Sequence, residues 1–268
     1  MSQITLLFVY SVAAAAFAMS RLPRCSEYSR LLLAAAFALC AAALAAHARL
    51  LYSSVMPGDA IELSLSNALS LIGLQLALIG LLAAFEPVLR GLVAGLLILA
   101  ALAALATGSP AAVAGGASLT WQLEAHILIS MFAYGLLSAG AIIAIYALIQ
   151  DRRLRAGQLS AMNHLFAPLE TTEKLLYGVT TAGFAGLTLA IVSGAMFVEN
   201  LFAQHLVHKT VLSLLAWLLF GTLLAGRYFA GWRGKRAVYL YLGGFALLCL
   251  AYFGSRYILE ELLHRSWG

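Results

Sequence analysis

Long uninterrupted apolar runs recur along the whole chain and constrain its fold more than any other feature. A helix that crosses the hydrocarbon core of a bilayer needs about 20 predominantly apolar residues. Eight runs approach this length, at about 4–20, 31–52, 61–85, 89–107, 120–149, 174–198, 207–230 and 236–258. Only 10% of the residues are charged, against roughly 25% in an average soluble domain. The sequence therefore predicts an all-α, polytopic membrane bundle of about eight transmembrane helices, forming a single integral membrane domain over residues 1–268.

Lys and Arg are unevenly distributed between the two sides that eight alternating helices would create. Twelve of the 16 basic residues fall in one set of connections and four in the other. Because cytoplasmic loops are enriched in Lys and Arg, we expect the twelve to face the cytoplasm and both chain termini to lie outside. The net charge of +5 is explained by these loops next to the lipid bilayer, so no nucleic-acid partner is expected.

Histidine is concentrated on the expected outer side. The topology places only His164 inside, and it places outside His47, His126, His205, His208 and His264. Histidine has little influence on membrane orientation, so this bias suggests a role for imidazole at the outer face. His205 and His208 stand together at the start of the seventh run, where they form either an interfacial cluster that reaches water or part of a binding site.

The helix expected at 120–149 carries a polar row that begins with His126. Ser130, Tyr134 and Ser138 follow at steps of four residues, which keeps them on roughly one helix face. Polar side chains are costly in lipid, so this face should point into the bundle or a cavity. The row could contact a ligand or cofactor, or it could form hydrogen bonds between helices.

The chemistry that these residue types allow is limited. Two neutral imidazoles can hold a haem iron axially, whereas zinc usually needs three or four protein ligands. The three cysteines, Cys25, Cys40 and Cys249, form no CxxC or CxxCH pair. The chain also has no H-E-x-x-H, Walker or dinucleotide-binding motif. We therefore expect that the protein is not an enzyme.

Two segments of the C-terminal half carry a more specific pattern. The motif GWRGKRA at 231–237 precedes a GF…YFG pattern in the last apolar run, and WQLEAHILISMFAYGLLSAG at 121–140 has a histidine near its start. Over about residues 119–260 the chain resembles the cytochrome c assembly family of CcsA- and CcmC-like proteins, and within it the YpjD/HemX-like inner-membrane branch. Residues 1–118 resemble this family only in hydropathy.

The resemblance implies a haem-handling protein of the bacterial inner membrane, with other cytochrome c biogenesis proteins as partners. It implies that His126 and His208 bind the haem iron, with Trp121 as a nearby aromatic contact. Tyr134, on the face of His126, is a further candidate for cofactor binding. Haem-presenting members carry an outer tryptophan-rich W-G-x-W-x-W-D segment, but the loop here reads ENLFAQHLVHK. This departure favours an accessory or regulatory role in haem handling over haem lyase activity.

Two other functions are compatible with the same fold. A small-solute or ion transporter could use Glu124, His126 and Tyr134 to line a path, since ionisable side chains inside membranes often mark such pathways. A non-catalytic scaffold for a membrane complex would need no polar path. A haem absorbance signal would distinguish the first hypothesis from both alternatives.

Overall fold

The computed structural model describes residues 2–56, 64–107, 120–157, 167–197 and 207–254, and these residues form helices joined by turns. The eight α-helices are α1 (Gln3–Met19), α2 (Ser29–Val55), α3 (Leu65–Ala83), α4 (Arg90–Ala104), α5 (Trp121–Arg155), α6 (Leu169–Phe197), α7 (Val207–Ala230) and α8 (Lys235–Cys249). Short 3-10 segments, η1 (Pro23–Tyr28) and η2 (Pro87–Leu89), precede α2 and α4, and a π-helical turn, η4 (Leu250–Gly254), extends α8. The predicted all-α bundle of about eight helices is confirmed.

Most of these helices have the length and composition of membrane spans. Six of them, counted with their 3-10 extensions over the described residues, are long and apolar enough to cross a bilayer, and α1 is a slightly shorter apolar helix of 17 residues. Each α-helix overlaps one predicted run, but α5 continues six residues past the predicted end at 149, and α6 begins five residues before the predicted start at 174. Helix α8 ends at Cys249, before the predicted end at 258. The last turn of α5 carries Arg152, Arg153 and Arg155, so the helix extends beyond the apolar part of its sequence.

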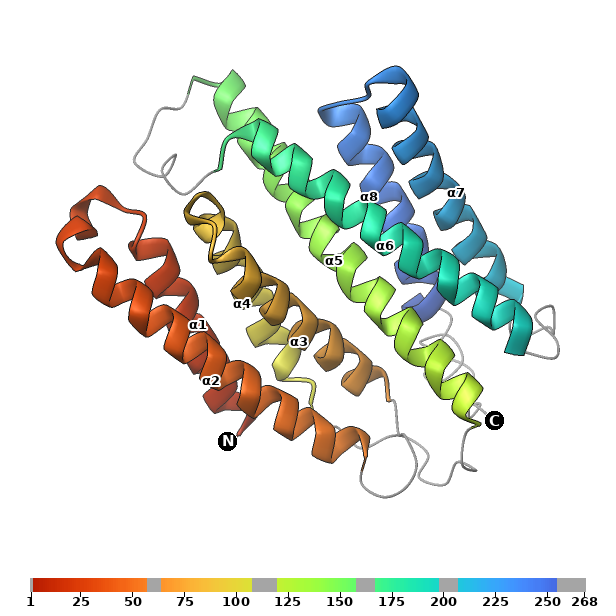
Figure 1. The fold of residues 1–268 in the computed structure, drawn as a ribbon, viewed down its shortest axis with the longest axis horizontal. Helices are drawn as coiled ribbons and strands as arrows, with labels where there is room; N and C mark the ends of the chain where they lie inside the picture. The colour runs from red at the N-terminus through yellow and green to blue at the C-terminus, as the bar shows by residue number, and fades with distance from the viewer. Residues whose placement is uncertain (1, 57–63, 108–119, 158–166, 198–206, 255–268) are drawn as a thin grey trace.

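The helices form two groups of four that lie side by side (Figure 1). In the first group α1 contacts α2 and α4, and α3 contacts α4; in the second, α5 contacts α6 and α8, and α7 contacts α8. Helix α3 packs against α5 and joins the groups. At this junction Gly135 of α5 lies directly against the side chain of Gln75, and a Cβ at position 135 would collide with the Gln75 amide oxygen.

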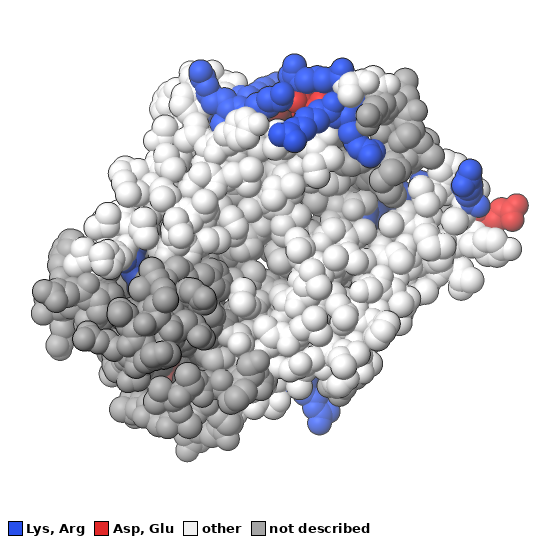
Figure 2. Space-filling view, turned by 180° about the vertical axis from the view of Figure 1, so that it is seen from behind, with Lys and Arg blue, Asp and Glu red and all other residues white. Residues whose placement is uncertain are grey.

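Successive helices run in opposite directions, so their connections alternate between two ends of the bundle (Figure 1). One end, called here the basic end, carries twelve of the 16 basic residues in or beside the α1–α2, α3–α4, α5–α6 and α7–α8 connections. Lys and Arg gather visibly over this end in Figure 2. At the opposite end, α5 and α7 begin and α6 ends. The even helix count agrees with the prediction, and the placement of the basic end in the cytoplasm stays a prediction.

Small residues let α5 and α6 approach closely. Ala133 of α5 lies 3.1 Å from the position that a Cβ on Gly186 would occupy, and Leu137 lies 2.7 Å from the corresponding position on Gly183. Close backbone approach of this kind is the usual means of helix association in lipid. In the sequence of α6, small residues recur at steps of four: Ala182, Gly186, Ala190 and Gly194. Of these, Ala190 is also buried, whereas Ala182 is exposed. Since a helical turn has 3.6 residues, a stripe in steps of four drifts around the helix and Gly183 replaces Ala182 on the packed face.

Helices α5 and α8 hold each other through two buried tyrosines. The Tyr134 hydroxyl of α5 donates to the backbone carbonyl of Leu248 (2.8 Å), and the Tyr241 hydroxyl of α8 donates to that of Leu137 (2.8 Å). Gly140 leaves the space that the Tyr241 ring occupies. The backbone of each helix therefore accepts a buried hydrogen bond from a tyrosine of the other, and these two bonds fix the register of α8 against α5.

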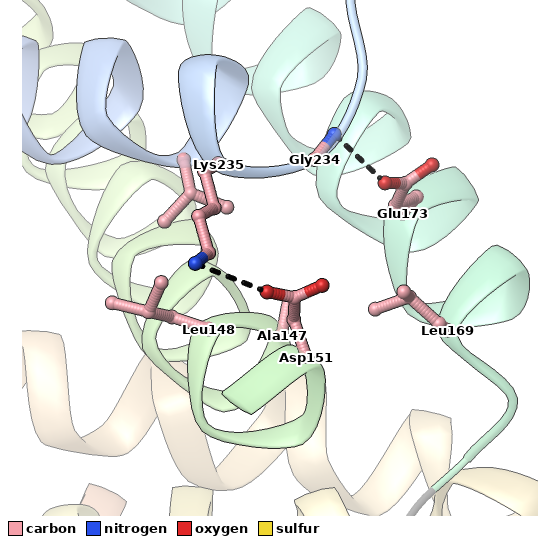
Figure 3. Close-up of a pocket in the computed structure, with 8 residues that line it drawn as sticks. Ala147, Leu148, Asp151, Leu169, Glu173, Gly234 and Lys235 are labelled. Carbon is pink, nitrogen blue, oxygen red and sulfur yellow. Dashed lines mark hydrogen bonds and ion pairs between the residues drawn. The ribbon is translucent and has the colours of Figure 1, made fainter. Parts of the chain in front are cut away.

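The GWRGKRA motif forms a fixed turn between α7 and α8 at the basic end. The Trp232 carbonyl accepts hydrogen bonds from the Tyr177 hydroxyl (2.7 Å) and the Arg227 guanidinium (3.3 Å). Gly234 has φ 66° and ψ −145°, which glycine adopts without strain. Its N–H donates to the Glu173 carboxylate of α6 (3.0 Å), while Lys235 pairs with Asp151 of α5 at 3.7 Å (Figure 3). The turn between α7 and α8 thus also contacts α5 and α6.

Candidate functional site

His126 lies on α5 and faces α6, at the end of the bundle opposite the basic end. It is the sixth residue of α5, and its ring faces the last two turns of the antiparallel helix α6. The imidazole Nδ1 is 2.9 Å from the hydroxyl oxygen of Ser193, and this hydroxyl donates to the backbone carbonyl of Ala190 at 3.0 Å. The side chain is half-buried. The polar face predicted for this helix therefore does point into the bundle at His126.

Gly194 allows the His126 ring to lie directly on α6. A Cβ at position 194 would be 3.0 Å from Cε1 of the ring, which is closer than most real contacts of a Cβ atom. The glycine near the end of the small-residue face of α6 thus leaves space for the imidazole ring. Neither Ser193 nor its hydrogen bond was expected from the sequence, although Gly194 belongs to the small-residue pattern of that helix.

Trp121 lies beside the end of α6, at the same end of the bundle as His126. It is the first residue of α5, its side chain is 70% exposed, and its ring centroid is 6.5 Å from that of Phe197, the last residue of α6. An exposed indole paired with a second ring at a helix end is typical of the aromatic belt of a membrane protein. The same pair also offers an apolar surface one turn away from His126.

Tyr134 is held in the interior. Its side chain is only 7% exposed, and its hydroxyl is engaged by the Leu248 carbonyl. Its ring centroid is 5.6 Å from that of Tyr252 in η4, and the Lys209 ammonium of α7 lies 5.9 Å from the Tyr252 centroid. This series of contacts connects α5 with the start of α7 at the opposite end.

His208 is the second residue of α7, next to Lys209, and its side chain is exposed. Among the described residues, no hydrogen bond joins it to His126. By the contacts above, helix α5 is linked to the start of α7 through Tyr252 of η4, and His208 itself is exposed. Within the described ranges, no group of three or more His, Cys, Asp or Glu residues could hold a metal ion.

His47 occupies a separate environment in the first helix group. It is fully buried; its Nδ1 is 3.3 Å from the Tyr10 hydroxyl, and its Nε2 is 2.8 Å from the Ser70 hydroxyl. Both ring nitrogens already have partners, so His47 ties α1, α2 and α3 together and has no nitrogen free for a ligand. The remaining histidines, His164, His205 and His264, lie outside the described residues.

Comparison with known proteins places these helices in one family. The family model of "Cytochrome C assembly protein" matches residues 3–263. The match therefore also covers the N-terminal helices, and the expectation that residues 1–118 resemble the family only in hydropathy was wrong. The inner membrane protein YpjD of Escherichia coli K12 is 38% identical over 138 residues, which are 52% of each chain. An uncharacterized 28.8 kDa protein of Azospirillum brasilense is 31% identical over 63% of each chain, and the cytochrome c biogenesis protein CcsA of Guillardia theta is 26% identical over 54%.

The aligned part of the chain spans about half the length of the first curated relatives it matches. No solved structure matches it. The family match covers nearly all of the chain and includes both the α5–α6 region around His126 and the fixed turn between α7 and α8. The chain therefore belongs to the cytochrome c assembly family and is a multi-pass protein of the bacterial inner membrane.

Proposed function

We propose that this protein binds haem at the end opposite the basic end, with His126 and His208 as iron ligands, and that it acts as an accessory or regulatory component of cytochrome c assembly. Membership of the cytochrome c assembly family supports the pathway. The observation that carries the proposal is the environment of His126. Its imidazole is half-buried and packs against α6 at Gly194, and its Nδ1 is 2.9 Å from the Ser193 hydroxyl.

The residues at this end fit the chemistry of haem. A neutral imidazole is a common axial ligand of haem iron, and metal-binding histidines usually donate their second ring N–H to a hydrogen-bond acceptor. The Ser193 hydroxyl oxygen, 2.9 Å from Nδ1 of His126, is placed to accept such a hydrogen bond. Trp121 and Phe197 offer aromatic surface for a porphyrin face. When bound, the haem would supply a redox-active iron, and one imidazole from α5 and one from α7 would hold it.

Tyr134 takes a supporting part in this proposal. Because its hydroxyl is committed to the Leu248 carbonyl, it orients α8, and its ring contact with Tyr252 orients η4. Its contact with Tyr252, and that of Tyr252 with Lys209, link α5 to the start of α7 through η4. This arrangement supports His208 as the second ligand.

The accessory role follows from the loop between α6 and α7. Its sequence, ENLFAQHLVHK, contains no tryptophan, so it lacks the W-G-x-W-x-W-D segment of haem-presenting family members. We propose that the protein holds or senses haem and works with other cytochrome c biogenesis proteins, with the twelve basic residues in the cytoplasm and the haem site on the outer side.

Absorbance spectroscopy of the purified protein tests the proposal. The protein, isolated in detergent with added haem, should show a Soret band that is lost in His126→Ala and strongly weakened in His208→Ala. His205→Ala is the matched control, because it removes a histidine only three residues from His208 and should leave the band unchanged. Free imidazole should restore the band in His126→Ala. An absent band in the native protein, or one retained in both ligand variants, would rule out the proposed ligands.

A further inference from the structure

The hydrogen bond between His126 and Ser193 has a direction that matters for metal binding. We infer that Ser193 is a positioning residue that fixes the tautomer of His126, so that Nδ1 carries the proton and Nε2 keeps a free lone pair. The role of this lone pair as an iron ligand rests on the proposed function, but the tautomer itself belongs to the protein without haem.

The single proton of the serine hydroxyl determines the direction. Ser193 Oγ lies 3.0 Å from the carbonyl oxygen of Ala190, one turn earlier in α6, and donates to it. A hydroxyl has one O–H donor and two acceptor lone pairs. Once that proton points at Ala190, the oxygen can only accept from the imidazole, whose Nδ1 is 2.9 Å away. Nδ1 must then be the protonated nitrogen.

The same helix contains a second hydroxyl whose direction is fixed by its partner. Thr188 Oγ1 donates to the Phe184 carbonyl at 2.8 Å and lies 2.9 Å from the indole nitrogen of Trp217. An indole N–H is a donor only, so Thr188 must accept from Trp217 while its own proton goes to the helix backbone. Ser193 makes a similar pair of contacts, with the Ala190 carbonyl three residues earlier and with His126. Helix α6 therefore presents two hydroxyl groups as acceptors to neighbouring helices.

The consequence for His126 is that Nε2 is available to bind a metal ion. A neutral imidazole has one N–H and one acceptor nitrogen, so protonation at Nδ1 leaves Nε2 unprotonated. The contact of Cε1 with the backbone at Gly194 holds the ring against α6. Rotating the ring by half a turn would replace Nδ1 with a carbon and break the bond to Ser193. The second hydrogen bond of a metal-binding histidine fixes its tautomer and orientation in this way.

Nitrogen-15 NMR of the haem-free protein tests the inference. The protein is labelled at histidine, and the His126 signals are assigned by their loss in His126→Ala. In native protein the signals should show Nδ1–H and an unprotonated Nε2. Ser193→Ala should shift His126 toward the Nε2–H form, and Ser193→Thr, which keeps a hydroxyl, should restore the native pattern. Thr188→Val removes the comparable bond to Trp217 and should leave His126 unchanged.

The outcomes separate the inference from the haem proposal. Nδ1–H in the native protein together with no haem binding would support the inference and refute the function. Nε2–H in the native protein would overturn the inference even if haem binds, and this result needs no variant to fold. If haem binds, Ser193→Ala should weaken binding by about ten- to one hundred-fold. It should also raise the midpoint potential, because the imidazole donates less electron density to the iron; Thr188→Val should change neither.

Discussion

The contact between Gly140 and Tyr241 allows a prediction in which one substitution changes sign with its background. A Cβ on Gly140 would lie 2.6 Å from Cζ of Tyr241 and closer still to its hydroxyl, although real Cβ contacts below 3.0 Å are essentially never observed. Tyr241 is fully buried and cannot turn outward. Gly140→Ala must therefore displace the tyrosine and weaken its hydrogen bond to the Leu137 carbonyl.

The size of the effect follows from these two losses. Overpacking of a filled core costs about 1–3 kcal/mol, and a hydrogen bond between membrane helices contributes about 0.6 kcal/mol on average. Gly140→Ala should thus lower the free energy of unfolding by about 2–4 kcal/mol. In a Tyr241→Ala background the obstructing ring is gone. There the same substitution should stabilise the protein by up to about 1 kcal/mol, the helix preference of alanine over glycine.

Unfolding by sodium dodecyl sulfate in mixed micelles, followed by circular dichroism, measures these free energies. The double-mutant cycle should give a coupling of about 3 kcal/mol between positions 140 and 241. Tyr241→Phe is the control that keeps Cζ in place, so Gly140→Ala should remain destabilising in that background. If Gly140→Ala costs the same with and without the Tyr241 ring, the proposed packing of α5 on α8 is refuted.

Three further substitutions test other parts of the structure. Gly234→Ala should lower the free energy of unfolding by about 1–3 kcal/mol in the same micelle titration, because φ 66° with ψ −145° is strained for any other residue; an unchanged midpoint would contradict the assigned turn. Ser70→Ala leaves the buried Nε2 of His47 without its partner and should cost about 0.6–1.7 kcal/mol; a neutral result would show that this bond is not formed. Gly194→Ala crowds the His126 ring and should weaken haem binding in an absorbance titration without unfolding the protein; unaltered affinity would show that the contact of His126 with α6 at Gly194 is not needed for haem binding.

The sequence predicted the helices well because hydropathy directly reports which segments can lie in a bilayer. It predicted the end of α5 less well. The apolar run stops at 149, but the helix continues through Arg155, where Arg155 pairs with Asp151 at 3.0 Å. Charged residues end a hydrophobic segment without ending its helix, since side-chain pairs at a spacing of four residues stabilise the exposed last turns.

The site was predictable only in part. The position of His126 on an inward face could be inferred from the spacing of polar residues along a single helix. Its partner Ser193 could not, because the pairing depends on the register between α5 and α6. The position of Gly183 in place of Ala182 on the packed face shows the same limit. His47 also could not be distinguished from His126 by sequence, since its two hydrogen bonds come from other helices.

The central claim is that imidazoles from α5 and α7 share one haem iron. Electron paramagnetic resonance of the ferric, haem-loaded protein tests it most directly, because two axial imidazoles give a low-spin signal and one gives a high-spin signal. The native protein should be low-spin, and His208→Ala should become high-spin while His126 still holds the iron. A native protein that is already high-spin, or a low-spin signal that persists in His208→Ala, would contradict the claim.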